Sequence, residues 1–219
     1  MARKFGKIGS FDSLWQKHES LYTSIFVEAL NTLQITDTQR NDEDAISEIL
    51  CLEIKKVCFR RKCVKIPQWE APIEPSTQQD LKGGKIRMRP DFTCSIINSF
   101  AESYEMHNLS FHIECKRLGQ RVGSWNLNKN YVTNGVCRFD TRTHEYGKRA
   151  ASGMMIGYIV NMDHDAILLD VNSHLLRQGF SKLVFDIQRK ISTCEQRMNR
   201  NQIAPAEFKL IHLWANLCS

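Results

Sequence analysis

The sequence predicts an α/β protein in which helices flank a central sheet. Apolar residues recur at helical spacing in some segments and at every second position in others. The two kinds of segment are mixed along the chain, in the order helix, helix, strand, strand, helix, strand, helix, helix, strand. This mixture favours one sheet covered by helices. The chain has 219 residues, 42% of them apolar, and is therefore long enough to bury the core of such a sheet.

The first two predicted elements are helices. Apolar residues from Phe11 to Leu33 form a broad helical stripe over residues 11–34. This stripe suits packing on the sheet, and the other interpretation is a dimer element. A second helix is expected over residues 42–61, because acidic residues begin it and basic residues end it, as the helix dipole favours. Three of the five prolines then fall between residues 67 and 75 and predict an irregular segment.

Two strands follow, because the apolar period changes to two. The first is expected over residues 85–96, with a bend at Pro90, and the second over residues 109–116. Side chains of a strand alternate between the two faces of its sheet. The face of the second strand that points away from the core therefore carries four polar residues: Ser110, His112, Glu114 and Lys116.

The remaining elements are predicted from the same patterns. We expect a helix over 125–138, a charged loop over 140–151 and a buried strand over 153–160. Two helices, over 163–176 and 181–198, and a last strand over 208–217 complete the chain.

Charge, apolar runs and cysteine spacing bear on the partners, the membrane association and the zinc binding of the chain. The formal net charge of +6 is compatible with a polyanionic partner. No run of apolar residues is long enough for a transmembrane helix, so no membrane partner is expected. The eight cysteines include no Cys-x-x-Cys pair and no zinc-finger spacing, which indicates reduced core thiols and a cytoplasmic location.

The residues that point to chemistry lie on the two central strands. Asp91 opens the first strand, and Glu114 and Lys116 leave one face of the second. A carboxylate or an ammonium buried alone costs several kcal/mol, so the group is best explained as a metal site. Asp91, Glu114 and the backbone carbonyl of Cys115 would supply the hard oxygen ligands that Mg²⁺ prefers, with Mn²⁺ as the alternative ion. Lys116 would then lie beside the water opposite a scissile phosphate.

This motif resembles that of the PD-(D/E)xK nucleases, the superfamily with the restriction-endonuclease-like fold. The matching residues are Pro90-Asp91 and, after 22 intervening residues, Glu114-Cys115-Lys116. The resemblance covers residues 42–160 and implies an α-β-β-β-α-β core, with one more strand that we expect between residues 64 and 73. It also implies a mixed sheet and cleavage of phosphodiester bonds.

With this resemblance, residues 1–219 are interpreted as a single nuclease-like domain with three parts. Residues 1–40 form an N-terminal helical extension, residues 42–160 the catalytic core, and residues 161–219 the C-terminal helices and strand.

Many members of the superfamily carry a further acid on the helix before the sheet, and helical phase selects among three candidates. Glu43 lies three residues before Ile46, on the inward face near the helix start. Glu48 falls about 200° around the helix and should face solvent. Glu53 shares the apolar face at a deeper position. We choose Glu43 as the additional catalytic acid and metal ligand, with Glu53 second; a first-turn acid that complements the helix dipole is the alternative interpretation.

Basic residues flank both halves of the motif and predict contacts with a phosphate backbone. Arg138, at the end of a predicted helix, could bind a phosphate or cap helix carbonyls. Trp69 and Trp125 could stack on bases, although packing is the favoured interpretation. The residues chosen as nucleic-acid-binding are Arg87, Arg89, Arg117, Arg121 and Arg138.

The function expected from the motif and its resemblance is that of a metal-dependent DNA endonuclease. The pattern from Tyr131 to Tyr158, which includes Gly135 and Gly153, is also similar to nuclease-fold proteins of bacterial anti-phage systems. Defence against foreign DNA, as a homodimer or as a subunit of a larger defence complex, is therefore expected. The alternatives are a nuclease that acts on RNA and an inactive nucleic-acid-binding or assembly subunit on the same scaffold.

Overall fold

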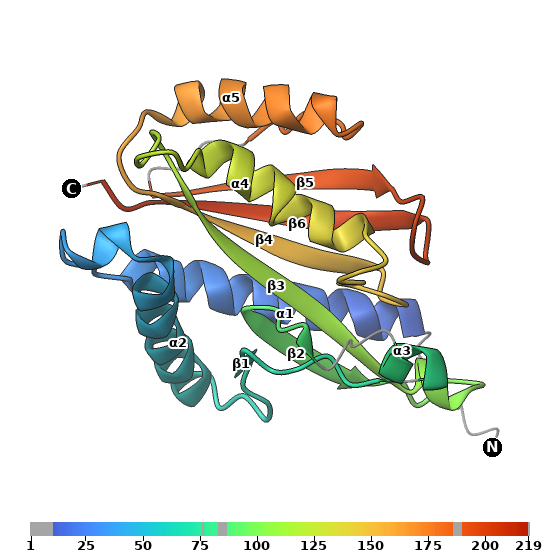
Figure 1. The fold of residues 1–219 in the computed structure, drawn as a ribbon. Coiled ribbons are helices and arrows are strands. Elements are labelled where there is room, and N and C mark those ends of the chain that lie inside the picture. Colours follow the sequence, from blue (N-terminus) through green and yellow to red (C-terminus); the bar gives the residue numbers. More distant parts are fainter. Residues whose placement is uncertain (1–10, 76, 83–86, 186–189, 219) are drawn as a thin grey trace, which may run out of the picture.

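The computed structural model describes residues 11–75, 77–82, 87–185 and 190–218, and it places a mixed six-stranded sheet between helices (Figure 1). Short 3-10 turns join several of the elements. In chain order the helices and strands are α1 (Phe11–Thr32), α2 (Glu43–Arg60), β1 (Gln68–Trp69), α3 (Gln78–Lys82), β2 (Phe92–Ile97), β3 (Asn108–Leu118), α4 (Leu127–Thr133), β4 (Ser152–Ile159), α5 (His164–Arg177), β5 (Ile191–Asn199) and β6 (Glu207–Asn216).

The strand order in the sheet is β1-β2-β3-β4-β6-β5. β1, β2 and β3 are antiparallel neighbours, whereas β3, β4 and β6 run parallel, and β5 is antiparallel to β6. Every residue of β4 is buried, as expected for a parallel strand covered on both faces. The predicted class, an α/β fold with helices on a mixed sheet, is confirmed.

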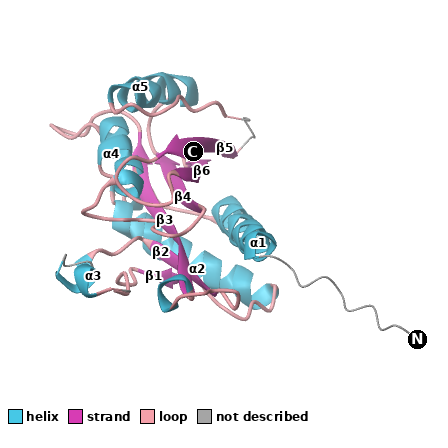
Figure 2. Ribbon diagram, turned by 90° about the vertical axis from the view of Figure 1, so that its right-hand side faces the viewer, coloured by secondary structure: helices cyan, strands magenta, loops and turns pink. Residues whose placement is uncertain are grey.

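Helices cover the two faces of the sheet in two layers (Figure 2). α1 and α2 pack on one face through Phe26 and Ile46, and α4 and α5 pack on the other through Tyr131 and Val171. The indole Nε1 of Trp15 donates a hydrogen bond to the Ser152 hydroxyl on β4, at 2.9 Å. α1 therefore packs on the sheet, as the broad apolar stripe predicts.

The prediction of a helix over residues 181–198 is wrong. Residues 186–189 lie outside the described residues, and Ile191–Asn199 is strand β5. Cys194, Gln196 and Met198 are buried at every second position, and all nine residues pair with β6. Packing against a neighbouring strand decides this segment, because local preference is weak for so polar a sequence.

Two other predicted elements are shorter than expected. Of the strand predicted over 85–96, residues 85 and 86 lie outside the described residues, and strand pairing begins only at Phe92. Pro90 has no N–H to donate to a ladder, which is consistent with the late start. The helix predicted over 125–138 ends at Thr133, and a 3-10 turn over Val136–Asp140 follows. The strand expected between residues 64 and 73 is present as the two residues of β1.

None of the helices in the described part of the chain combines the length and the apolar character needed to span a bilayer.

Candidate active site

The site forms where β3 extends beyond β2. The register pairs Phe92 with Ile113, so Asp91 stands opposite Glu114, one position past the end of the paired ladder. Beyond that point the backbone N–H groups along this edge of β3 have carboxylates as partners. The Cys115 N–H donates to Asp91 Oδ2 at 2.5 Å, and the Arg117 N–H donates to Glu43 Oε2 at 3.0 Å. Two acids from distant segments are thus fixed at the edge of one strand.

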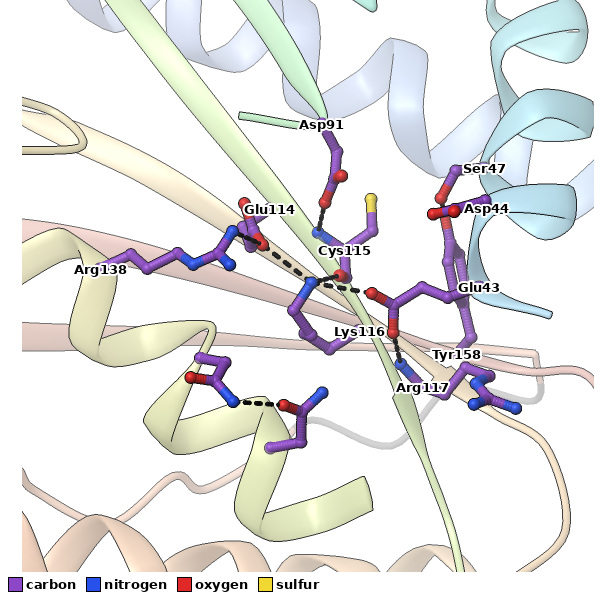
Figure 3. A network of polar contacts seen from close by, with 12 residues as sticks. Glu43, Asp44, Ser47, Asp91, Glu114, Cys115, Lys116, Arg117, Arg138 and Tyr158 are labelled. Carbon is purple, nitrogen blue, oxygen red and sulfur yellow. Dashed lines mark hydrogen bonds and ion pairs between the residues drawn. The ribbon is translucent and has the colours of Figure 1, made fainter. Parts of the chain in front are cut away.

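The Lys116 ammonium lies at the centre of this cluster (Figure 3). It donates to Glu43 Oε1 at 2.8 Å and to the Cys115 carbonyl at 2.7 Å, and it lies 2.8 Å from Glu114 Oε1. An ammonium has three N–H donors, and these three oxygens can accept all of them. The structure therefore brings together all of the residues that the sequence predicts as catalytic or metal-binding: Glu43, Asp91, Glu114, Cys115 and Lys116.

Glu114 has an asymmetric environment. Its side chain is 0% exposed, and its Oε1 accepts from both Lys116 and the guanidinium of Arg138, the latter at 2.5 Å. Its Oε2 is buried and has no hydrogen-bond partner among the described residues. Leaving a buried carboxylate oxygen unsatisfied costs about 1–3 kcal/mol or more, so this oxygen is a natural ligand for a cation.

Burial also changes the acid strength of the two central carboxyls. It raises the pKa of Glu114 to about 8, and the neighbouring Asp91 adds to this effect. Burial raises the pKa of Asp91 to about 6, although Lys116 and the Cys115 N–H oppose the change. Burial alone would lower the pKa of Lys116, but the surrounding carboxylates raise it above its ordinary value. The two carboxyls therefore lack full charge compensation, which a bound cation would supply.

The start of α2 positions Glu43. The Asp42 side chain caps the helix by accepting from the backbone N–H groups of Asp44 and Ala45, so the helix begins at Glu43 beside β3. Glu48 is exposed, as its helical phase predicts. Glu53, the second choice, is bonded to Lys56 and Thr32 and is not part of the cluster.

Arg138 enters the site from the 3-10 turn after α4. Its guanidinium binds Glu114 and lies over the Tyr146 ring, 5.9 Å from the ring centroid. Gly135 allows this tight turn: a Cβ there would lie 2.3 Å from the Tyr131 carbonyl oxygen. The sequence interpretations of Arg138, a phosphate ligand or a helix cap, missed this ion pair, because nothing in the local pattern links it to β3.

The other predicted nucleic-acid-binding residues are distributed over the surface. Arg87, Arg89 and Arg121 are exposed. The Arg117 side chain is half-buried, and its guanidinium donates to the Asn41 carbonyl.

The favoured interpretation of Trp69 and Trp125 as packing residues is wrong. Trp69 is 37% exposed and Trp125 is 55% exposed. Trp69 lies on the two-residue edge strand β1, and Trp125 lies on an isolated bridge with Val122 outside the sheet.

The capacity of the cluster to bind a metal ion depends on its oxygen donors. In the part of the chain that the structure describes, no group of three or more His, Cys, Asp or Glu side chains is placed to hold a metal ion. Mg²⁺ is usually bound through one or two carboxylates and keeps several waters. Asp91 and the unsatisfied Oε2 of Glu114 fit this smaller requirement, and both are oxygen donors. The Cys115 carbonyl, the third expected ligand, is bonded to Lys116 here.

Comparisons with protein-family models, with curated proteins and with solved structures found no match to this chain.

Proposed function

We propose that this chain is a metal-dependent endonuclease of the PD-(D/E)xK type that hydrolyses DNA phosphodiester bonds. The observation that carries the proposal is the buried Oε2 of Glu114, which has no partner among the described residues and belongs to a cluster with Asp91 and Lys116. A carboxylate pair with one fully buried member, beside a buried ammonium, matches the needs of metal-assisted phosphoryl transfer.

The order of elements supports a restriction-endonuclease-like core. Apart from the five-residue helix α3 between β1 and β2, the chain from α2 to β4 follows α-β-β-β-α-β, with the acidic residue before β2 and the Glu-x-Lys motif on β3. α4 connects β3 to the parallel neighbour β4. The motif residues therefore occupy adjacent positions of one sheet, although 22 residues separate Asp91 from Glu114 in the sequence.

The proposed mechanism assigns a role to each residue. Asp91, Glu114 and the Cys115 carbonyl would hold Mg²⁺ or Mn²⁺, and Glu43 contributes to the same charge cluster. When bound, the ion polarises the phosphate and lowers the pKa of a bound water. To orient the attacking water, Lys116 would give up one of its three present acceptors, and its ammonium would stabilise the negative charge that develops on the phosphate. Arg138 holds Glu114 in position and offers a guanidinium to the phosphate backbone.

The proposed substrate and context follow from charge and symmetry. The net charge of +6 and the exposed Arg87, Arg89 and Arg121 favour a polyanion. Cutting both strands of a duplex requires two sites, so a homodimer or a subunit of a larger defence complex is proposed. Light scattering with and without DNA tests this, and a monomer under both conditions would contradict it.

A cleavage assay tests the catalytic proposal. Purified protein is incubated with supercoiled plasmid and Mg²⁺ or Mn²⁺, and labelled RNA is digested in parallel. We expect Asp91→Asn and Lys116→Ala to lower the rate of DNA cleavage at least about 100-fold. Glu48→Gln changes an exposed acid on the same helix as Glu43 and serves as the matched control.

Three results would change the proposed function. Cleavage by both variants at the parent rate would refute the proposed site. Faster cleavage of RNA than of DNA would change the substrate. No cleavage, together with a melting temperature that neither ion changes, would favour an inactive nucleic-acid-binding or assembly subunit.

A further inference from the structure

A polar cavity of about 230 Å³ lies beside the Glu114–Lys116 cluster. Its floor is formed by β2 and β3, and two irregular segments, residues 71–75 and residues 145–149, contribute to its walls. The proposed mechanism uses none of the residues that line it. The floor residues are Thr93, Ser95, Ser110 and His112.

The strand register places this cavity directly next to the proposed catalytic groups. Thr93 pairs with His112, and Ser95 pairs with Ser110, so these side chains continue the polar face that begins with Glu114. His112 and Glu114 are two residues apart on one strand, which corresponds to roughly 6.6 Å. A ligand in the cavity would therefore lie about one nucleotide from a phosphate held at Glu114.

The floor of the cavity offers hydrogen-bonding groups for a ligand. Thr93 is 7% exposed, and its hydroxyl is buried with no partner among the described residues. The Gly147 N–H donates to His112 Nδ1 at 3.0 Å, so the other ring nitrogen of His112 carries the proton. An unsatisfied buried hydroxyl is unfavourable, and a polar ligand edge would satisfy it.

The charge of the lining excludes a phosphate as the occupant. Four carboxylate side chains and only two basic side chains line the cavity. Lys148 is bonded to Asp80 at 2.8 Å, and Arg149 to Glu105 at 3.5 Å, so both cations are already compensated. The four carboxylates are likewise partnered, by Lys148, by Arg149 and by the Asn108 amide. Among the described lining residues, the acceptor that remains for an amino group of a nucleobase is therefore the Thr93 hydroxyl.

The size of the cavity fits one ring system. Its volume is about 230 Å³. It is below the range of about 300–1,000 Å³ that holds drug-sized ligands. Tyr104 is among the lining residues and is 74% exposed, so it offers an aromatic face on which a neighbouring base could stack.

We propose that this cavity binds a single unpaired nucleobase with an exocyclic amino group, in the strand whose adjacent phosphate is cleaved. The proposal rests on the proposed nuclease function and narrows the substrate to nucleic acid with an unpaired nucleotide next to the cut. Bases within an intact duplex are stacked and paired, and placing one in the cavity would require flipping it out.

The test uses 2-aminopurine, a fluorescent base with an exocyclic amino group, placed at successive positions of single-stranded oligonucleotides. The Asp91→Asn variant binds these strands without cutting them. We expect fluorescence to rise at one position only, because a base in the cavity leaves its stacked neighbours. Adding Thr93→Val, which removes the hydroxyl but keeps the shape, should weaken binding about three- to tenfold.

Thr23→Val is the matched control, because the Thr23 hydroxyl is also buried without a partner among the described residues but belongs to α1, outside the cavity. An abasic nucleotide at the responsive position should weaken binding to the Asp91→Asn protein, and by a smaller factor once Thr93 is valine. Tight binding with equal fluorescence at every position, or equal effects of the two valine variants, would overturn the cavity proposal and leave the nuclease proposal standing. A single responsive position without cleavage by the parent protein would support the cavity and refute the nuclease. Failure to bind any oligonucleotide would overturn both.

Discussion

Replacing Glu114 with glutamine substitutes a neutral amide for a buried titratable carboxyl and keeps the shape of the side chain. Glu114 is 0% exposed, and burial raises its pKa from 4.5 to about 8. The folded protein therefore keeps this proton to a higher pH than the unfolded chain does. Between pH 4.5 and pH 8 unfolding releases a proton, so the free energy of unfolding of the parent protein falls as pH rises. Glutamine does not titrate and has no such dependence.

The size of the effect follows from the pKa change. Each pH unit between the two pKa values corresponds to about 1.36 kcal/mol. From pH 4.5 to pH 7 the relative stabilisation of Glu114→Gln therefore reaches about 3 kcal/mol, and it levels off above pH 8. For a chain of 219 residues this equals a rise in Tm of about 6–12 °C at pH 7. The same substitution should abolish metal-dependent cleavage.

Urea unfolding in metal-free buffer, measured from pH 5 to pH 8.5, provides the assay. Glu48→Gln is the control, because an exposed substitution should change stability by less than about 0.5 kcal/mol at every pH. A Glu114→Gln protein that is less stable than the parent at pH 7 would refute the reasoning. A stability difference that stays constant with pH would do the same, since it would place the charge of Glu114 in a solvated environment.

Three further substitutions test how the site is built. Lys116→Met removes the ammonium from the buried carboxylates and should lower the free energy of unfolding by about 3–5 kcal/mol in urea; a loss below 1 kcal/mol would mean that the cluster is solvated. Asp42→Ala removes the cap of α2 and should lower the free energy of unfolding by about 1 kcal/mol in the same assay. It should also slow cleavage, because the cap fixes the start of the helix at Glu43. Unchanged stability and cleavage would contradict this positioning role. Gly135→Ala places a Cβ 2.3 Å from the Tyr131 carbonyl oxygen and should lower the free energy of unfolding by about 1–3 kcal/mol. Thermal unfolding measures this, and an unchanged Tm would show that the turn can relax.

Local patterns were sufficient to predict most of the candidate site. Alternation along β3 placed Glu114 and Lys116 on one face, and helical phase selected Glu43 over Glu48; both predictions agree with the observed contacts. These inferences succeed because side-chain direction depends only on the geometry of one element. The contact of Glu43 with Lys116 is observed, whereas the catalytic roles of both residues remain predictions.

The long-range parts of the structure could not be predicted in the same way. The segment Ile191–Asn199 was expected to be helical and is a strand, because its pairing with β6 outweighs its local preference. The ion pair of Arg138 with Glu114 depends on the turn at Gly135 and on the path of the chain after α4. The exposure of Trp125 likewise depends on where its loop lies relative to the sheet.

The sequence alone determined the α/β class, the order of most elements and the faces on which the acidic and basic residues stand, because periodicity is a property of each element's own backbone. The tertiary structure decided which of these residues meet. Asp91 and Glu43 reach the same edge of β3 only because β2 begins late and α2 starts beside that edge. The unsatisfied oxygen of Glu114 and the cavity beside His112 also arise from packing between distant segments, which no local pattern records.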